Sequence, residues 1–255
     1  MKSLRRVFSF FILLLVFNSG HVCAQTSSDE ALSNFVAAGI SYKAGQYDEA
    51  INLYNGMLTS RWVSGPLYYN LGNAYFKKGD LGRAVLSYER AKHFIPRDSD
   101  LRFNRQYVLA KVTQYGNGQK NSVFDRLIDG HVQFYTIDEM VIIFSVLGLA
   151  FCGSILIFSY FRCPVIVQRC MMIFLMFSFL IYACGLIIKV QDQKGKAIVL
   201  QSTESYFEPR SDSTVHFKLS EGMKARILKV EGKWTKIERS DKKIGWMTKE
   251  LLEEI

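Results

Sequence analysis

Cysteine is scarce in this 255-residue chain, and none of its five cysteines lies in a hydrophilic segment. Cys23 is close to the N-terminus, and the other four fall among long apolar runs between residues 152 and 184. The hydrophilic parts of the chain therefore have no disulfide framework and no cysteine-based metal site. Ordinary packing is the expected role of the four later cysteines, which are Cys152, Cys163, Cys170 and Cys184.

Recognisable catalytic motifs are also missing. The sequence has no glycine-rich phosphate loop ending in lysine, no HExxH metal pair and no GxSxG nucleophile elbow. Three histidines follow residue 24, and no two of them have ligand spacing, since His93, His131 and His216 lie in different segments. We therefore expect a protein that is not an enzyme and that uses no metal or other cofactor.

The chain also lacks a run of basic residues. Its 32 Lys and Arg outnumber 23 Asp and Glu, but the resulting net charge of +9 is dispersed, which does not indicate nucleic-acid binding. Charged residues at 22% and aromatic residues at 14% exclude wholesale disorder and a collagen-like fibre. Hydrophobic residues make up 49% of the chain, and they are concentrated in two places.

The first concentration lies at the N-terminus. Three positive charges precede an apolar run at residues 7–17, and the small-residue pattern Val22-Cys23-Ala24 follows. This order is typical of a secretory signal peptide, here residues 1–24, and the run is too short for a comfortable bilayer span. Lipoprotein processing at Cys23 is the weaker alternative because Val22 is not a small residue. Cleavage would leave a net charge of about +6.

The second concentration is a pair of chargeless stretches. Residues 140–161 and 170–188 contain 22 and 19 residues without a charge. As helices they would be about 28–33 Å long, which matches a hydrocarbon core of roughly 30 Å. Only eight residues, 162–169, separate them, so the helices must be antiparallel neighbours. We expect a transmembrane hairpin with spans at 140–161 and 170–190, and two buried helices of a soluble core are the alternative.

Charge at the ends of the hairpin predicts its orientation. Arg162 and Arg169 flank the short loop, whereas Asp138 and Glu139 precede the first span. The positive-inside rule therefore places the loop, residues 162–169, in the cytoplasm. Both long flanks would then lie on the periplasmic side of the inner (cytoplasmic) membrane, and the signal peptide predicts the same for the N-terminal flank.

The N-terminal flank contains a repeat with a period of 34 residues. Gly45, Tyr47, Ala50 and Tyr54 recur as Gly79, Leu81, Ala84 and Tyr88. Gly72 and Ala84 supply small residues where two antiparallel helices would touch, and Pro96 ends the second copy. This pattern resembles the tetratricopeptide repeat, a pair of antiparallel helices. A third copy begins near Asp98 but lacks a recognisable second helix, so its first helix would seal the stack. We expect an all-α solenoid over residues 25–115.

The resemblance implies a groove that binds extended segments or helices of partner proteins. Asn70 and Asn104 are one period apart, and a side-chain amide can hold a partner backbone with a donor and an acceptor together. Bracing of neighbouring helices is the alternative for the asparagines, and packing is the alternative for the tyrosines. The remaining groove positions of the family map onto Phe35, Tyr42, Tyr69, Asn73, Phe76 and Lys77.

Two further segments complete the flanks. Residues 116–139 combine a polar linker with a mildly amphipathic stretch that would lie at the membrane surface. Residues 196–255 show short alternating strands with tight turns at Glu221-Gly222 and Glu231-Gly232-Lys233. The sequence therefore predicts a multidomain membrane protein whose C-terminal domain is small and all-β.

Glycine and tryptophan pairs in this C-terminal segment resemble the bacterial SH3-type domain. The pattern runs from Glu221-Gly222 through Gly232-Lys233-Trp234 to Gly245-Trp246. The resemblance implies a small barrel, and relatives often bind cell-wall peptides or protein segments. Trp234 and Trp246 are candidate binding residues, but core packing is the favoured alternative because a sixty-residue barrel needs large apolar side chains inside.

The order of signal peptide, short repeat array, two-span hairpin and SH3-type domain resembles the BatE-like repeat proteins of the Bat aerotolerance group of Bacteroides-type bacteria. The segment Pro96–Asn104 contributes to this resemblance. It implies a role in oxygen-stress tolerance, as a scaffold for Bat proteins that carry von Willebrand A-type domains. Two roles stay open: a periplasmic scaffold that recruits membrane proteins through the repeat groove, and a peptidoglycan-binding protein that acts through the barrel. The first is favoured because the array is the larger part.

Overall fold

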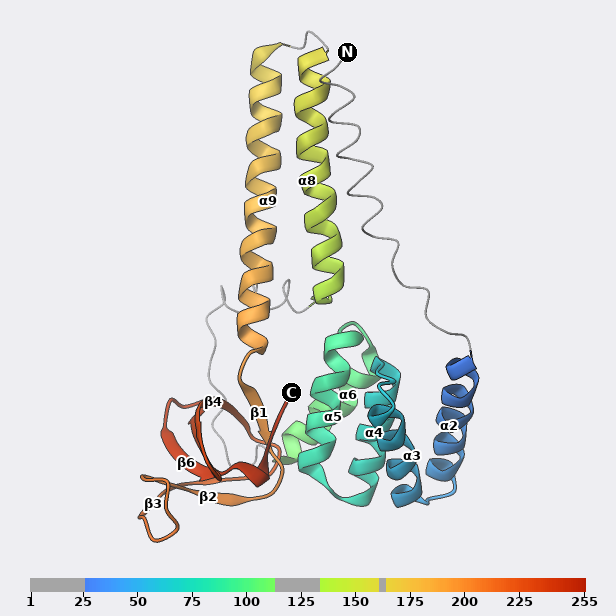
Figure 1. Cartoon of the computed structure of the whole chain (residues 1–255), viewed down its shortest axis with the longest axis vertical. Coiled ribbons are helices and arrows are strands. Elements are labelled where there is room, and N and C mark those ends of the chain that lie inside the picture. The colour runs from blue at the N-terminus through green and yellow to red at the C-terminus, as the bar shows by residue number, and fades with distance from the viewer. Residues whose placement is uncertain (1–25, 113–133, 161–163) are drawn as a thin grey trace.

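The computed structural model describes residues 26–112, 134–160 and 164–255 of the chain. The signal peptide predicted at 1–24 lies outside these residues, as does most of the linker predicted at 116–139. The helices are α2 (Thr26–Lys43), α3 (Tyr47–Thr59), α4 (Gly65–Lys78), α5 (Leu81–Phe94), α6 (Ser99–Val112), α8 (Ile137–Tyr160) and α9 (Val165–Gln193). Seven short strands follow α9 (Figure 1).

Helices α2 to α6 form the predicted array of two antiparallel pairs and one further helix. Side-chain caps begin α4 and α5: Ser64 accepts a hydrogen bond from the backbone N–H of Leu67, and Asp80 accepts one from the backbone N–H of Arg83. Gly79 ends α4 with a φ of 91°, a left-handed conformation that costs glycine little. A Cβ on Gly72 would lie 2.7 Å from the ring of Tyr88, so this glycine permits the close approach of α4 and α5 that the repeat predicts.

Helices α8 and α9 are each long and apolar enough to span a membrane. They pack as antiparallel neighbours, and the ring centroids of Phe144 and Phe179 are 4.3 Å apart. The predicted loop at 162–169 is too long, because α9 already begins at Val165. Pro164 is the N-cap residue, a place where proline starts a helix rather than breaking it.

The C-terminal strands form one antiparallel sheet in the order β3-β2-β6-β5-β4-β1-β7. Among the described strands, β3 and β7 each have one neighbour, so the sheet is open and differs from the closed barrel that the sequence predicted. Val199, Ile237 and Met247 pack in its core. The strands are β1 (Lys196–Val199), β2 (Thr203–Tyr206), β3 (Val215–Leu219), β4 (Lys224–Glu231), β5 (Trp234–Arg239), β6 (Ile244–Thr248) and β7 (Leu252–Glu254).

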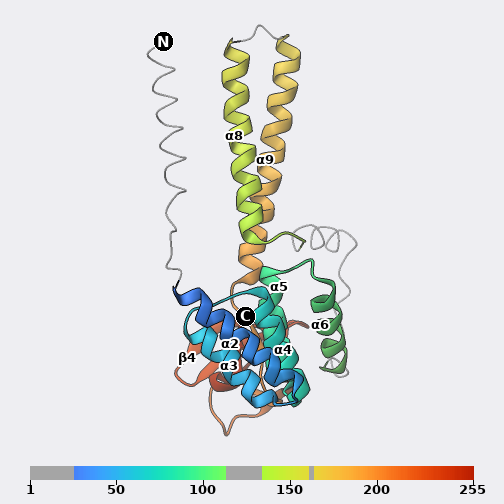
Figure 2. The same ribbon diagram turned by 90° about the vertical axis from the view of Figure 1, so that its right-hand side faces the viewer.

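The array and the sheet lie at the same end of the helical hairpin, as both views show (Figure 1, Figure 2). Two contacts fix the base of the hairpin. Arg97, which follows α5, donates to both carboxylate oxygens of Glu139 on α8, at 3.0 and 2.5 Å. Lys189 on α9 donates to the backbone carbonyl of Tyr135. The two flanks therefore share one side of any membrane that the hairpin crosses.

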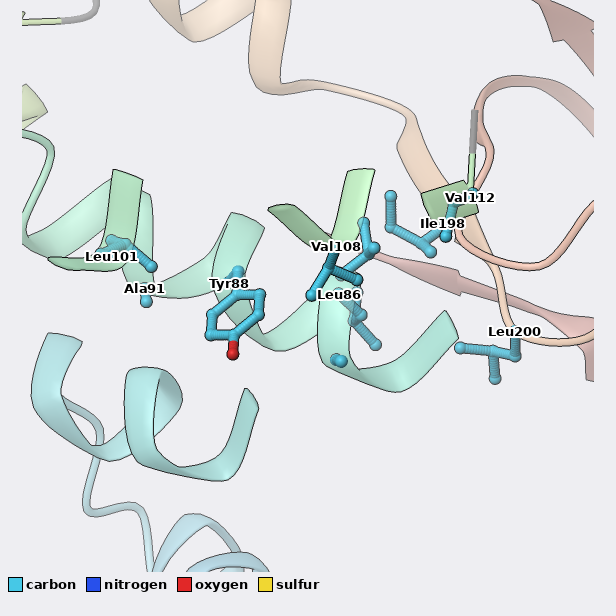
Figure 3. Packing of buried hydrophobic residues seen from close by; sticks show 10 residues of the cluster. Leu86, Tyr88, Ala91, Leu101, Val108, Val112, Ile198 and Leu200 are labelled. Carbon is cyan, nitrogen blue, oxygen red and sulfur yellow. The ribbon is translucent and has the colours of Figure 1, made fainter. Parts of the chain in front are cut away.

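The array and the sheet share a hydrophobic core, whereas the sequence treats them as separate domains. Strand β1 is buried on both faces, since Val199 packs into the sheet and Ile198 packs against the array. Leu200 joins the same cluster beside α5 (Figure 3). A Cβ on Gly82 of α5 would clash with the backbone carbonyl of Leu200, so this close approach requires glycine. The sheet thus packs against α5 and α6 at the end of the array that follows the second helix pair.

A buried ion triad reinforces this junction. The side chain of Glu89 on α5 is 5% exposed, and it bonds to Arg105 of α6 at 2.5 Å and to Lys224 of β4 at 2.8 Å. Burial alone would raise the pKa of Glu89, but the positive charges of Lys224 and Arg105 outweigh burial and lower the pKa to about 2. Glu89 is therefore ionised at neutral pH and links two helices to the sheet.

Candidate partner-binding face

The first helices of the three repeats, α2, α4 and α6, place residues 34 positions apart on one shared face. Contacts between neighbouring helices confirm this arrangement for α4 and α6. The amide of Asn104 donates to the hydroxyl of Tyr69 at 2.9 Å, and the rings of Phe76 and Tyr107 have centroids 5.8 Å apart. We call this surface the A-helix face, and it comprises Phe35, Tyr42, Lys43, Tyr69, Asn73, Phe76, Lys77, Phe103, Tyr107 and Lys111.

Polar side chains in and below the A-helix face form hydrogen bonds that join α4 to α3, α5 and α6. The side-chain oxygen of Asn73 accepts hydrogen bonds from the hydroxyl of Tyr88 at 2.7 Å and from the amide of Asn104 at 3.1 Å. Asn70 likewise bonds to the hydroxyl of Tyr54. These contacts brace α4 against α5, α6 and α3, which is the alternative that the sequence left open. A direct contact between these amides and a partner stays a prediction.

Two predicted groove residues on the first repeat are partly buried by their own repeat. Phe35 meets Tyr54 edge-on with a centroid separation of 5.9 Å, and Tyr42 lies 5.6 Å from Tyr47. Burial is the first cause that raises the pKa of Tyr42. Packing within the first repeat therefore accounts for the positions of these two rings, and the more exposed rings lie on α6.

Helix α6, the first helix of the third repeat, carries residues of this face that were not predicted from the sequence. Phe103 is 69% exposed and Tyr107 is 49% exposed, although both are large and apolar. The ammonium of Lys111 lies 5.3 Å from the ring centroid of Phe76 and 4.9 Å from that of Tyr107, close enough for cation–π attraction. The 34-residue period relates Phe103, Tyr107 and Lys111 to Tyr69, Asn73 and Lys77, so this period is the sequence signal that indicates them.

Lysines give the A-helix face a positive edge. Lys43, Lys77 and Lys111 are one period apart, and each is exposed in the last turn of its helix. A lysine at this place also interacts favourably with the helix dipole, which is a purely structural role. The row of three positive charges beside exposed aromatic rings can in addition attract an acidic segment of another protein.

In the described ranges, no group of three or more His, Cys, Asp or Glu side chains could hold a metal ion.

The tryptophans of the sheet are buried. Trp234 is 7% exposed and Trp246 is 8% exposed, and the ring of Trp234 meets Tyr206 edge-on at 5.8 Å. Strand alternation places both tryptophans on the face opposite Ile237 and Met247. Packing, the favoured alternative, is therefore the role that these contacts show, and binding of cell-wall peptides by these rings stays untested.

Comparison with known families supports the repeat region. Residues 65–92, which include α4 and most of α5, match the family model of the tetratricopeptide repeat. A comparison with curated proteins gives no match. Neither result bears out the resemblance to the Bat aerotolerance group, which stays a proposal. The N-terminal part of this chain therefore contains a tetratricopeptide repeat, within a helical array of the kind that mediates protein–protein interaction.

Proposed function

We propose that this chain is a membrane-anchored scaffold that recruits a protein partner through the A-helix face and acts by binding rather than by catalysis. Its main support is the row of exposed lysines at a 34-residue period, Lys43, Lys77 and Lys111, together with the exposed rings of Phe103 and Tyr107 on α6. These residues belong to a helical array in which residues 65–92 match the tetratricopeptide repeat. Exposed rings such as Phe103 and Tyr107 have the character of binding hot spots, because burying them against a partner removes much apolar area from water.

The chemistry of the A-helix face favours an acidic partner segment. Lys43, Lys77 and Lys111 form a row that runs across three helices, so an extended chain with carboxylates at intervals would meet each of them. Charge pairs of this kind chiefly accelerate association and select the partner, while the aromatic rings supply most of the affinity. The partner that we propose is therefore an acidic segment with an apolar anchor for Phe103 and Tyr107.

We further propose the cellular setting that the sequence favours. The hairpin crosses the inner membrane with its short loop in the cytoplasm, so the array and the sheet lie in the periplasm. The resemblance to the Bat group supports a role in aerotolerance with partners that carry von Willebrand A-type domains. If such a partner is itself held in the membrane, a shared bilayer raises its effective concentration, so a small interface is sufficient.

The test is partner recovery from detergent extracts with the double variant Lys77→Gln, Lys111→Gln. We expect about tenfold weaker binding, which corresponds to about 1.4 kcal/mol for two interfacial charge contacts. The control is Lys218→Gln, Lys242→Gln, which removes the same charge from exposed positions in the sheet. Equal recovery with both variants would contradict the proposal. Deletion of the array is less suitable, because it would strip Ile198 and Leu200 of the helices that bury them.

The alternative function is peptidoglycan binding through the sheet. Sedimentation of the full chain with purified cell wall tests it directly. Binding that persists in the Lys77→Gln, Lys111→Gln variant would support the sheet as the binding element. The burial of Trp234 and Trp246 leaves this alternative without exposed indole rings at these two positions.

A further inference from the structure

The loop between α3 and α4 exposes a short apolar segment. Residues 59–64 are all exposed, and two of them carry large apolar side chains. Trp62 is 37% exposed and Val63 is 48% exposed. We call Arg61, Trp62 and Val63 the α3–α4 loop tip.

Backbone hydrogen bonds define the conformation of the α3–α4 loop tip. The backbone N–H of Arg61 donates to the carbonyl of Leu58 at 3.0 Å, and that of Trp62 donates to the carbonyl of Met57 at 3.0 Å. These two bonds form a Schellman motif, which usually has glycine at the position that Arg61 occupies. Arg61 has a φ of 63°, a left-handed conformation that is unfavourable for residues other than glycine. The loop therefore has an exposed arginine where glycine would be more favourable for the backbone.

Contacts with α5 place the α3–α4 loop tip at the end of the array that faces the hairpin. Gly65 begins α4 directly after the loop, and a Cβ on Gly65 would lie 2.7 Å from the side chain of Ile95. Two residues beyond Ile95, Arg97 binds both carboxylate oxygens of Glu139 in the first turn of α8. The end of α5 that leads into α6 points toward the hairpin (Figure 1). The loop tip therefore lies on the same side of the array as the base of the hairpin.

Two further exposed rings lie at this end of the array. Phe94 is 46% exposed, and its ring stacks on that of Tyr68 in the first turn of α4 with a centroid separation of 6.0 Å. Phe134, which precedes α8, is 50% exposed, and the guanidinium of Arg97 lies 5.3 Å from its ring centroid. Exposed apolar side chains that lie together mark contact sites for proteins or membranes. Here they belong to the end of the array that is next to the apolar helices α8 and α9.

The contact between Arg97 and Glu139 sets the level of this end relative to the proposed membrane. The chargeless stretch of α8 begins at Met140, directly after Glu139, so Glu139 marks the edge of the span. The headgroup layer extends roughly 5–8 Å beyond the hydrocarbon core on each side of a bilayer. If α8 and α9 span a membrane as proposed above, the α3–α4 loop tip faces the headgroup layer.

We propose that the α3–α4 loop tip docks on the bilayer that the hairpin crosses, with Trp62 and Val63 in the headgroup layer and Arg61 beside lipid phosphates. Tryptophan is enriched in this layer because its ring is apolar while its N–H is polar. Arginine can bind phosphate while its methylene groups cover apolar surface. The docking would be a second attachment of the array to the membrane and would fix the orientation of the A-helix face. The proposal rests on the membrane placement of α8 and α9 proposed above.

Quenching of tryptophan fluorescence by brominated lipids tests the proposal. The full chain is reconstituted in vesicles of phosphatidylglycerol and phosphatidylcholine. Because the chain has three tryptophans, the emission lost in Trp62→Phe is that of Trp62. We expect phosphatidylcholine that is brominated near its headgroup to quench this emission about twofold, relative to unbrominated lipid. Phosphatidylcholine that is brominated near the ends of its acyl chains should quench it less.

The matched control moves the tryptophan to the opposite end of the array. In the double variant Trp62→Phe, Gln46→Trp, the new ring replaces an exposed side chain in the turn between α2 and α3. We expect neither brominated lipid to change its emission. Val63→Asp is a second variant at an exposed position, so it should reduce the quenching of Trp62 and leave the fold intact.

Three results would overturn the docking. The first is equal quenching of Trp62 and of the ring introduced by Gln46→Trp. The second is quenching of Trp62 that Val63→Asp leaves unchanged. The third is emission from Trp62 that neither brominated lipid reduces.

Alkaline carbonate extraction of the same vesicles separates this proposal from the proposed function. A chain that stays in the bilayer and recovers its partner through Lys77 and Lys111, but whose Trp62 is not quenched, would refute the docking alone. A chain that carbonate releases from the vesicles would refute the membrane anchor and the docking together.

Discussion

Replacing Glu89 by glutamine removes the negative charge at the centre of the junction between the array and the sheet. The carboxylate is 5% exposed and has a basic partner on each oxygen, Arg105 at 2.5 Å and Lys224 at 2.8 Å. Glutamine has almost the same shape, so the substitution changes charge and leaves packing nearly intact. Both basic groups would then face a neutral amide in a poorly solvated site.

The size of the effect follows from burial and from the pKa. Removing one partner of a buried ion pair costs about 3–5 kcal/mol. The lowering of the Glu89 pKa from 4.5 to about 2 corresponds independently to about 3 kcal/mol of stabilisation at neutral pH. Because the folded pKa lies below the unfolded one, this stabilisation is present above about pH 4.5 and is lost as the pH falls toward 2.

Urea unfolding of the full chain in nonionic detergent measures this loss, with the buried Trp234 and Trp246 as fluorescent reporters of the sheet. The matched control is Glu253→Gln. Glu253 also joins α5 to the sheet, through Arg90 at 2.9 Å, but its side chain is 44% exposed, so we expect a loss below about 1 kcal/mol.

Two results would refute this account of the junction. One is an equal loss of stability in Glu89→Gln and Glu253→Gln. The other is a difference between wild type and Glu89→Gln that stays constant as the pH falls from about 4.5 to about 2, since protonation of Glu89 should make the two proteins alike.

Further predictions concern close approach and the repeat core. Gly82→Ala should destabilise the junction because the new methyl group meets the Leu200 carbonyl, while Gly39→Ala, with open space around it, should be neutral or stabilising by up to about 1 kcal/mol in the same urea assay. Leu71→Asp should unfold the array without disturbing membrane insertion, because Leu71 is 3% exposed and a buried carboxylate costs several kcal/mol. Limited proteolysis measures the unfolding of the array. The control is Leu32→Asp, at a position that is 63% exposed. An array that stays protease-resistant in Leu71→Asp would show that the repeat register is wrong.

Periodic features of this protein were predictable from the sequence. The 34-residue period and the small residues at Gly72 and Ala84 predict the helix pairs, because close helix contact tolerates few side chains. The chargeless stretches predict α8 and α9, although α9 begins before Cys170, since the polar residues ahead of it do not stop a helix. The tight turns predict the strand connections of the sheet.

The packing of the sheet against the array was not predictable in the same way. Ile198 and Leu200 meet helices that lie more than eighty residues earlier in the chain, and no local pattern encodes that contact. One signal was present, because Ala197–Leu200 is apolar without interruption, whereas a strand with one exposed face alternates. No local pattern marks Glu89 as buried, because its partners Arg105 and Lys224 lie on other elements.

The central claim is that the A-helix face contacts a protein partner, and site-specific photo-crosslinking in cells tests it most directly. A photoreactive phenylalanine analogue at Phe103 should give a crosslinked adduct that weakens in the Lys77→Gln, Lys111→Gln background. The same analogue at Asn52, an exposed position on α3, should give none. The claim would be contradicted by equal adduct yields at both positions. It would also be contradicted by an adduct at Phe103 whose yield does not change in the Lys77→Gln, Lys111→Gln background.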